Sequence, residues 1–362
     1  MRTRAPGTAR LVEEQARVLL TMDLPWDWVP VITRAENPLA DVAAHHHPIM
    51  ARSRKFSFYS SFELGRIWRR AGCALGFSTA FFVPFSGAPV LANYFDANFF
   101  EDVDTWHRHR SAGRHLLMGA LLRHSIRRAQ RLFILSEYGR QRMADLFPRQ
   151  AHKFVVTPCG VTPPGRHSER PPAWDPARPF FLYVGSFSDN KNQRTLLDAW
   201  RILQDRHSDA PNLVLIGPCP TDYRIEVIGP RLKALPRPHE ICVTGFVPEA
   251  DLNWAYVHAM GYVQPSRAEG FGMPILEAMQ RGIPVACSDS TSLPETAGGA
   301  ALLFDPLDPE TMAATVERIW KDHTLRTSMA AAGRERAAFF TWEKNAKIVA
   351  DSILALLNRS RG

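Results

Sequence analysis

The sequence lacks several features that would each point to a distinct class of protein. No run of about 18 apolar residues is present, which argues against a membrane-spanning helix. The five cysteines are odd in number and form no CxxC pair, which indicates buried reduced thiols and excludes a disulfide-dense secreted scaffold. The basic N-terminus is not followed by an apolar segment, so it does not read as a signal peptide. We therefore expect a globular protein that is made and kept in the cytoplasm.

Negative charge is scarce in the first half of the chain. Residues 1–170 carry a net charge of +10, whereas residues 171–362 carry −2. Basic clusters such as these suit an anionic membrane surface, a phosphorylated lipid or nucleic acid, or they form a solvated face. No aromatic-rich basic strand or nucleic-acid module accompanies them, so we expect membrane contact rather than nucleic acid. The clusters lie on expected helices and comprise Arg66, Arg69 and Arg70, and Arg123, Arg127, Arg128 and Arg131.

The length of 362 residues predicts about two domains. Prolines gather between residues 163 and 179, and proline stops both helices and central strands, so we place the boundary there, between 1–165 and 166–340. In the second domain, short apolar runs alternate with amphipathic segments, which predicts a parallel sheet covered on both faces. The expected strands are 180–184, 213–216, 241–244, 261–264 and 284–287, and the expected helices are 193–206, 252–260 and 275–280.

The first domain is less regular, although it also reads as doubly wound α/β. We expect strands at 29–33, 80–83, 90–94 and 132–135, and helices at 12–20, 64–70, 114–128 and 138–147. A glycine loop at residues 7–10 opens the first helix, but no strand precedes it, although such domains usually begin with a central strand. That first strand is either contributed otherwise or lies upstream of Met1, and we favour the second explanation.

The segment 265–279 carries the clearest chemical signal. Its two glycines let the backbone approach a ligand, and Pro274 suits the first turn of the helix that follows. The amides near Met273 and Ile275 lie at that helix N-terminus, where phosphate binds well. Glu269 and Glu277 flank this cradle. Carboxylates do not bind phosphate, so these two either accept hydrogen bonds from sugar hydroxyls or form a helix-capping pair.

The Glu-x7-Glu spacing resembles the signature of retaining glycosyltransferases of family 4. The resemblance implies the GT-B fold, which consists of two Rossmann-like doubly wound domains facing across a cleft. It further implies that residues 341–362 form a helix that crosses back to the N-terminal domain. The other segments that resemble the family are Tyr183–Phe187, Lys191-Asn192, Thr244–Val247, Gly282–Val285, Leu293–Glu295, Phe304–Pro306 and Phe340–Trp342.

The resemblance also implies roles for individual residues. Glu277 would hold the ribose of a nucleotide sugar, and Glu269 would hold the sugar ring together with the amides of Phe271 and Gly272. Lys191 would neutralise the diphosphate leaving group, whose oxygen then takes the proton of the acceptor. The remaining expected donor-binding residues are Gly185, Ser186, Gly245, Val247, Gly270, Met273 and Ile275.

Two departures from the family pattern stand out. Ser186 and Asn190 occupy the places where relatives carry an arginine, whose phosphate contact Arg10 or Arg267 could replace. Phe95 occupies the place of a histidine near the reacting sugar. Asp96 is then either the acidic group that faces the acceptor, a catalytic role, or a plain turn residue at a strand end.

No metal or cofactor is expected. The Asp102-Val103-Asp104 motif lies far from the glycine cradle, and His45, His46 and His47 are adjacent, so they cannot all face one ion. We expect a metal-independent hexosyltransferase of cell-surface polysaccharide synthesis, with GDP-mannose favoured as donor and a UDP-sugar next. The acceptor would be a glycan or a lipid-linked glycan at the inner face of the cell membrane. The alternative is a catalytically weak glycosyltransferase-like scaffold that binds a nucleotide sugar or a partner protein.

Overall fold

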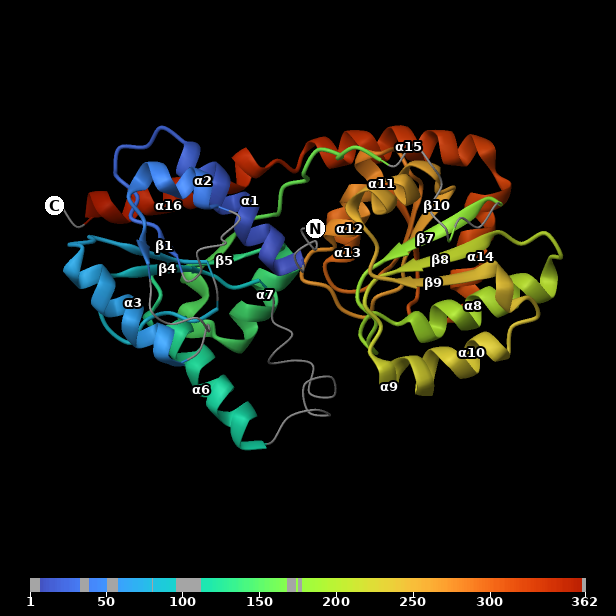
Figure 1. Cartoon of the computed structure of the whole chain (residues 1–362), viewed down its shortest axis with the longest axis horizontal. Coiled ribbons are helices and arrows are strands. Elements are labelled where there is room, and N and C mark those ends of the chain that lie inside the picture. The colour runs from blue at the N-terminus through green and yellow to red at the C-terminus, as the bar shows by residue number, and fades with distance from the viewer. Residues whose placement is uncertain are drawn as a thin grey trace. The chain divides into compact units, whose positions relative to one another are not determined.

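The computed structural model describes residues 7–32, 39–50, 58–79, 81–95, 112–167, 174 and 178–359. The chain divides into two compact units (Figure 1). We call residues 161–340 the C-terminal unit, and residues 5–160 together with 341–362 the N-terminal unit. The C-terminal segment 341–362 therefore belongs to the same unit as the N-terminal part of the chain.

The C-terminal unit is built on one six-stranded parallel sheet with the order β12-β11-β10-β7-β8-β9. Its strands are β7 (Phe180–Val184), β8 (Asn212–Ile216), β9 (Ile241–Gly245), β10 (Gly261–Gln264), β11 (Val285–Ser288) and β12 (Ala301–Phe304). Its helices are α8 (Gln193–Arg206), α9 (Thr221–Tyr223), α10 (Gly229–Lys233), α11 (Glu249–His258), α12 (Met273–Gln280), α13 (Leu293–Ala297), α14 (Pro309–Lys321) and α15 (His323–Ala338). Figure 1 shows α8, α10 and α14 on one face of the sheet and α11, α12 and α15 on the other.

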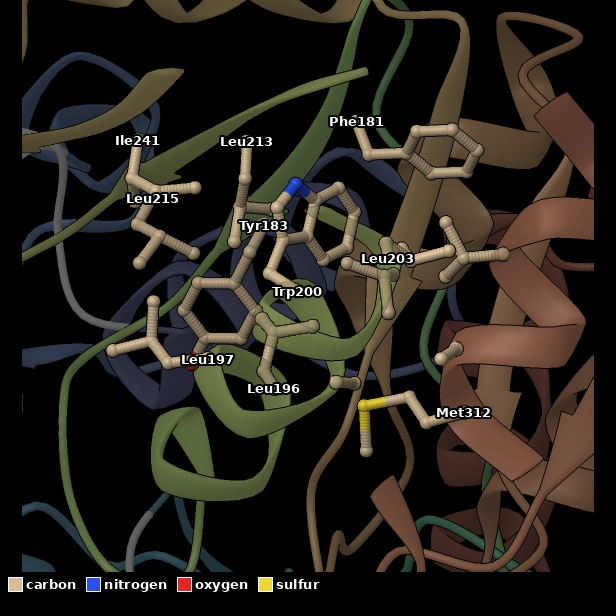
Figure 2. Close-up of a cluster of buried hydrophobic side chains, with 14 of the residues drawn as sticks. Phe181, Tyr183, Leu196, Leu197, Trp200, Leu203, Leu213, Leu215, Ile241 and Met312 are labelled. Atoms are coloured by element: carbon tan, nitrogen blue, oxygen red, sulfur yellow. The ribbon is translucent and has the colours of Figure 1, made fainter. Parts of the chain in front are cut away.

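Trp200 stands at the centre of the core on the α8 side. Its side chain is fully buried, and its indole N–H donates to the carbonyl of Pro211 at 2.9 Å. Figure 2 shows the ring among side chains of β7 and β8, with Met312 of α14 closing the cluster. Burial of these apolar side chains on both faces explains why the strands of this unit read as nearly continuous hydrophobic runs.

The N-terminal unit contains two separate parallel sheets. Four strands pair in the order β3-β4-β5-β6, and β1 pairs only with β2 among the described strands. The strands are β1 (Val31–Ile32), β2 (Ile49–Met50), β3 (Gly76–Ser78), β4 (Val90–Asn93), β5 (Arg131–Ile134) and β6 (Phe154–Val156). The helices are α1 (Gly7–Thr21), α2 (Ala40–Ala43), α3 (Phe58–Arg70), α6 (Ala112–Arg128), α7 (Glu137–Leu146) and α16 (Trp342–Arg359).

Helices cover both faces of the four-stranded sheet. On one face, α1 and α16 pack together against Leu91 and Phe133. On the other face, Trp68 of α3 and Ile126 of α6 join the core. No helix among the described residues is long and apolar enough to cross a membrane.

The expected strand at residues 80–83 is wrong for its described part, residues 81–83. The strand lies earlier, at β3. The backbone of the expected segment bonds to side chains instead of to a neighbouring strand: the Phe82 carbonyl accepts from Ser78 Oγ at 2.8 Å, and the Val83 N–H donates to Ser125 Oγ at 3.2 Å. Pro84 follows directly and could not continue a ladder.

Candidate functional site

The candidate site lies where the order of the C-terminal sheet reverses. Strand β7 is flanked by β8 on one side and by β10 on the other, so the chain leaves β7 in one direction and leaves β10 in the opposite direction. In open α/β sheets, ligands bind beyond the carboxyl ends of the strands at such a point. The loops that follow these two strands contain Lys191 and Glu269.

Glu269 receives three hydrogen bonds on a single carboxylate oxygen. Its Oε1 accepts from Lys191 Nζ at 2.6 Å, from Ser266 Oγ at 2.8 Å and from Gln264 Nε2 at 3.0 Å. No described residue donates to Oε2, and the side chain is 12% exposed. The carboxylate is therefore fixed through one oxygen, and the other can accept a hydrogen bond from a ligand hydroxyl.

The turn that carries Lys191 is fixed by the next residue, Asn192. Its φ of +60° lies in the left-handed region, which asparagine tolerates better than most residues. Its buried amide Nδ2 donates to the carbonyls of Pro265, at 3.0 Å, and Pro306, at 2.7 Å. One side chain thus ties together the segments that follow β7, β10 and β12. The N–H of Arg267, an exposed residue, donates to Asn190 at 2.8 Å and so lies beside this turn.

The turn at Gly185 and Ser186 is fixed by hydrogen bonds from buried side chains. The Ser186 carbonyl accepts from the Tyr183 hydroxyl at 3.1 Å and from Gln193 Nε2 at 3.0 Å. Burial raises the pKa of Tyr183 well above its usual value, and the nearby Glu269 carboxylate raises it further, so this hydroxyl stays protonated and able to donate. A Cβ at Gly185 would lie 2.6 Å from the Tyr183 oxygen, so only glycine fits there.

Residues 265–272, which contain Glu269 and which we call the glutamate loop, connect β10 to α12. Helix α12 begins directly after this loop. Gly272 has a φ of +96°, and a Cβ there would lie 2.5 Å from Leu293 Cδ2. Pro274 occupies the first turn. Of the two amides that we expected at a phosphate, that of Ile275 already donates to the Gly272 carbonyl at 3.1 Å. Met273 is the first residue of the helix, and Phe271 is buried against Phe340 at a ring distance of 5.5 Å.

Hydroxyl side chains from the end of β11 to α13 form hydrogen bonds along the glutamate loop. Thr291 Oγ1 accepts from the Glu269 N–H at 3.0 Å, and Ser292 Oγ donates to the Glu269 carbonyl at 2.8 Å. Three further hydroxyls donate to loop carbonyls, each at 2.5 Å: Ser288 to Ser266, Ser290 to Arg267 and Thr296 to Phe271. Thr291 has a φ of +54°, a strained value for a β-branched residue. Such strain is typical of functional sites.

Glu277 is buried in α12 and 6% exposed. Its Oε2 accepts from the Tyr256 hydroxyl of α11 at 3.0 Å. The guanidinium of Arg281 lies 4.7 Å from the centre of the Tyr256 ring, and it donates to the Glu277 carbonyl at 2.9 Å. The carboxylate that we expect to hold ribose is therefore oriented by a neighbouring helix.

Further expected site residues lie on β9, in the N-terminal unit or outside the described residues. Gly245 ends β9, at the sheet edge two strands from β7, and Val247 is buried just beyond it. Phe95 is buried in the N-terminal unit against Phe81, at a ring distance of 5.1 Å. Asp96 and the motif 102–104 lie outside the described residues. Within the described ranges, no group of three His, Cys, Asp or Glu side chains could hold a metal ion.

The chemistry that the site can perform follows from these contacts. It offers one cation, Lys191, paired with Glu269 in the loop that leads to α12, and a second fixed carboxylate, Glu277, within that helix. This combination suits a ligand that has both phosphate and hydroxyl groups. Sequence reasoning did not identify Gln264 and Ser266 as partners of Glu269, or the hydroxyl run 288–292. The signals that could have found them are polar residues at the end of an apolar strand and a dense run of serine and threonine.

Comparison with known proteins identifies the family of the C-terminal unit. Residues 166–336 match the family "Glycosyl transferases group 1". The chain is 33% identical over 232 residues to the O-antigen chain mannosyltransferase B of Escherichia coli. The matched region covers 61% of this chain and 60% of that protein. It is 28% identical over 183 residues to the mannosylfructose-phosphate synthase of Agrobacterium fabrum, which covers 49% of this chain and 39% of the relative. The chain thus spans less than two thirds of the length of these relatives.

Solved structures share the fold over nearly the whole chain. Sucrose-phosphate synthase from Thermosynechococcus elongatus matches with a TM-score of 0.75 at 20% identity, covering 98% of this chain and 94% of that one. WaaG, a glycosyltransferase involved in lipopolysaccharide biosynthesis, matches with a TM-score of 0.69 at 15% identity, covering 97% and 96%. The expected α/β GT-B fold, with two Rossmann-like units, is confirmed.

Proposed function

Because the C-terminal unit is a member of the group 1 glycosyl transferases, we propose that the protein transfers a hexosyl group from a nucleotide diphosphate sugar to a glycan or lipid-linked acceptor. The observation that carries this proposal is the pair formed by Lys191 and Glu269 at the reversal point of the sheet. A cation and a fixed carboxylate lie side by side there. A sugar diphosphate needs both, because its diphosphate leaving group gains negative charge during transfer and its sugar hydroxyls need hydrogen-bond acceptors.

Each side chain then has a defined task. Lys191 releases Glu269 and turns its ammonium to the diphosphate, where it stabilises the charge that develops as the bond to the sugar breaks. Glu269, still held by Gln264 and Ser266, accepts from a sugar hydroxyl. Glu277, oriented by Tyr256, accepts from the ribose. The departing phosphate oxygen takes the proton of the acceptor on the same face of the sugar, which retains the anomeric configuration.

Mannose carried by GDP is the donor that we favour, and a UDP-sugar is next. Support comes from the mannosyltransferase of O-antigen chains among the relatives, which also supports a role in polysaccharide synthesis. Arg267 is our candidate for the second phosphate contact, because its backbone is bonded to the turn that precedes Lys191.

The donor proposal is tested by thermal unfolding with GDP, UDP and ADP separately. A nucleotide at about 100 times its dissociation constant stabilises by about 2.7 kcal/mol, which raises the midpoint by roughly 2–4 °C. We expect one nucleotide to produce this shift, Glu277→Ala to abolish it, and Glu335→Ala, a change at an exposed position of α15, to preserve it. The absence of a shift with all three nucleotides would contradict the proposal. Turnover of any sugar donor would exclude the scaffold alternative.

We further propose that the N-terminal unit contacts an anionic membrane through α6. One face of this helix exposes Leu116 (73% exposed), Ala120, Arg123 and Arg127, which combines an apolar end with a basic end. Such a face suits a headgroup layer. Arg128 is excluded from this role, because its guanidinium donates to the carbonyls of Pro84, Gly87 and Ala88 within the unit.

Binding to vesicles of phosphatidylglycerol and phosphatidylcholine tests the membrane proposal. Arg123→Gln combined with Arg127→Gln should weaken binding at low salt, whereas Arg201→Gln combined with Arg206→Gln in the C-terminal unit should not. Equal binding by both double variants would contradict the proposal.

A further inference from the structure

Gln264, the last residue of β10, has hydrogen-bond partners at both ends of its buried side-chain amide. Its Nε2 donates to Ser266 Oγ at 2.7 Å and to Glu269 Oε1 at 3.0 Å, which uses both amide hydrogens. Its Oε1 accepts from the Tyr262 hydroxyl at 2.5 Å. Tyr262 lies two residues earlier in the same strand, so both side chains lie on one face of the sheet. The amide therefore connects the core of the unit to the carboxylate that we expect to hold the sugar.

The hydroxyl of Tyr262 determines which end of the Gln264 amide faces Glu269. Burial raises the pKa of this hydroxyl well above its usual value, and the neighbouring tyrosines and Glu269 raise it further. The hydroxyl thus keeps its proton and donates it, so the amide oxygen faces Tyr262 and the amide nitrogen faces Glu269. A flipped amide would place its oxygen against the carboxylate, where two acceptors repel each other.

The hydrogen bond from Gln264 differs from the one that Lys191 makes to the same oxygen. In the proposed reaction, Lys191 turns to the diphosphate, so its hydrogen bond to Glu269 is lost when the donor binds. The amide of Gln264 stays in place, because Tyr262 holds its oxygen and Ser266 holds its other hydrogen. Oε1 of Glu269 then keeps two neutral donors, and Oε2 is the oxygen that can accept from the sugar.

We propose that Gln264 is a positioning residue for sugar recognition, which holds Oε1 of Glu269 and so presents Oε2 to the sugar. This inference rests on the proposed transfer from a nucleotide sugar. Because Gln264 acts through Glu269, it should affect binding of the sugar part of the donor and not binding of the nucleoside diphosphate. A packing role for the same side chain would affect both alike.

Titration calorimetry of the 362-residue protein with a nucleoside diphosphate and with its sugar form tests the proposal. The nucleotides are GDP, UDP and ADP, and the sugar forms are GDP-mannose, UDP-glucose and ADP-glucose. Gln264→Glu keeps the shape of the side chain but places an oxygen against Glu269. At pH values where the introduced carboxyl is charged, affinity for the sugar form relative to the nucleoside diphosphate should fall by about tenfold or more, because a hydrogen bond to a charged group is lost.

The pH dependence of this loss distinguishes positioning from packing. Two carboxyls that share a site retain a proton to a higher pH than one alone, and the protonated carboxyl can again donate to Glu269. We therefore expect the loss to shrink as the pH falls from about 9 to about 6, and Gln264→Met, which has no such proton, to show the loss throughout.

The other titratable groups near this position do not imitate that pH dependence. Burial raises the pKa of Tyr183 and Tyr262, and it raises the pKa of Cys287, the register partner of Gln264 on β11, to about 12, so all three stay neutral over this range. The Lys191 ammonium attracts a charged carboxyl, which lowers the pH at which the proton returns. This attraction is weakest in the donor complex, where Lys191 faces the diphosphate.

Gln204→Glu is the matched control in the same unit. Gln204 of α8 is also buried, and its Nε2 donates to a carboxylate oxygen of Glu240 at 3.1 Å. Glu240 directly precedes β9, so it lies at the end of the parallel sheet opposite to the loops that contain Lys191 and Glu269. Both changes should lower the melting temperature, but only Gln264→Glu should change the relative affinity for the sugar form.

Tyr262→Phe is a second variant that leaves every atom of Gln264 in place. It removes only the donor that orients the amide, so it should lower the relative affinity for the sugar form by about 2–12-fold, the net worth of one typical hydrogen bond. The nucleoside diphosphate should bind this variant and the wild type alike.

The nucleoside diphosphates distinguish failure of this inference from failure of the proposed function. A wild type that binds none of the three would overturn the proposed function and the role of Gln264 together. Nucleotide binding with an unchanged relative affinity in Gln264→Glu, or an equal loss for the nucleotide and its sugar form, would overturn the role of Gln264 alone. A loss confined to the sugar form, reversed at low pH and absent in Gln204→Glu, would establish it.

Discussion

The sheet of the C-terminal unit is continuous, whereas that of the N-terminal unit is divided. Six strands pair without a break from β12 to β9, and the loops at their carboxyl ends are tied by buried side chains such as Asn192. In the other unit, β1 and β2 stand apart from β3 to β6, and residues of both β1 and β3 line one cavity. The Lys191–Glu269 pair thus lies in the unit with the continuous sheet, in the loops after β7 and β10, two strands that have neighbours on both sides.

The first way to test this comparison is to remove one tryptophan from each unit. Trp200→Ala should cost about 3–5 kcal/mol of unfolding free energy, because a fully buried ring and its hydrogen bond to Pro211 are lost. Trp28→Ala should cost clearly less, because this ring is only half-buried, lines the cavity, and its indole N–H has no partner among the described residues. Urea unfolding, monitored by hydrogen–deuterium exchange of the backbone amides in each unit, measures the unfolding free energy that each variant loses. Equal losses would mean that the cavity wall is packed as tightly as the core.

The second test compares one basic residue from each unit. Lys191→Ala should lower turnover by about 10²–10³-fold with little change in melting temperature, because its charge acts on the leaving group. Arg128→Ala should do the reverse. It leaves three carbonyls without their donor, which should cost about 1–3 kcal/mol of stability while the folded fraction keeps its activity. Donor turnover and thermal unfolding of both variants separate these effects. A stable, active Lys191→Ala variant would remove Lys191 from the mechanism.

The helices and strands of the C-terminal unit are easier to predict from the sequence than those of the N-terminal unit. The expected helix 193–206 and strand 261–264 coincide with α8 and β10, because long apolar periodicity and glycine at the strand boundaries agree there. In the N-terminal unit, β3 has only three residues, and Phe81 and Phe82 nearby form a stronger apolar run that is not a strand. Short strands carry too little pattern to compete with such a run.

The site was predictable in its charged residues but not in their partners. Glu269 and Lys191 are separated by 78 positions, yet both follow apolar strands, so a parallel sheet brings their loops to one edge. The hydroxyls of Ser288, Thr291 and Ser292 could not be paired with their carbonyls in advance. Their contacts depend on the path of the loop after β11, which no periodicity encodes.

The third test asks whether the glutamate loop depends on backbone shape. Gly272→Ala should cost about 1–3 kcal/mol, because alanine is strained at a φ of +96° and its Cβ would meet Leu293. It should also reduce the nucleotide-induced thermal shift by displacing the start of α12. Gly299→Ala is the matched control, since it has a φ of +84° but no atom within 4 Å of the added Cβ. It should show the strain cost alone. If both variants kept the full nucleotide shift, the start of α12 would not be part of the donor site.

The smallest expected effect concerns a single hydroxyl group. Tyr256→Phe removes the hydrogen bond to Glu277 and leaves the aromatic ring, so it should weaken binding of the recognised nucleotide by about 2–12-fold, the net worth of one typical hydrogen bond. If Tyr256 acts by orienting Glu277 toward ribose, a 2′,3′-dideoxy analogue should bind the variant and the wild type almost equally. Tyr223→Phe, which removes a hydroxyl bonded to the Ser188 carbonyl, should not discriminate between the two sugars. Titration calorimetry with both nucleotides measures this difference. An equal loss for both would make Tyr256 a packing residue rather than one that orients Glu277.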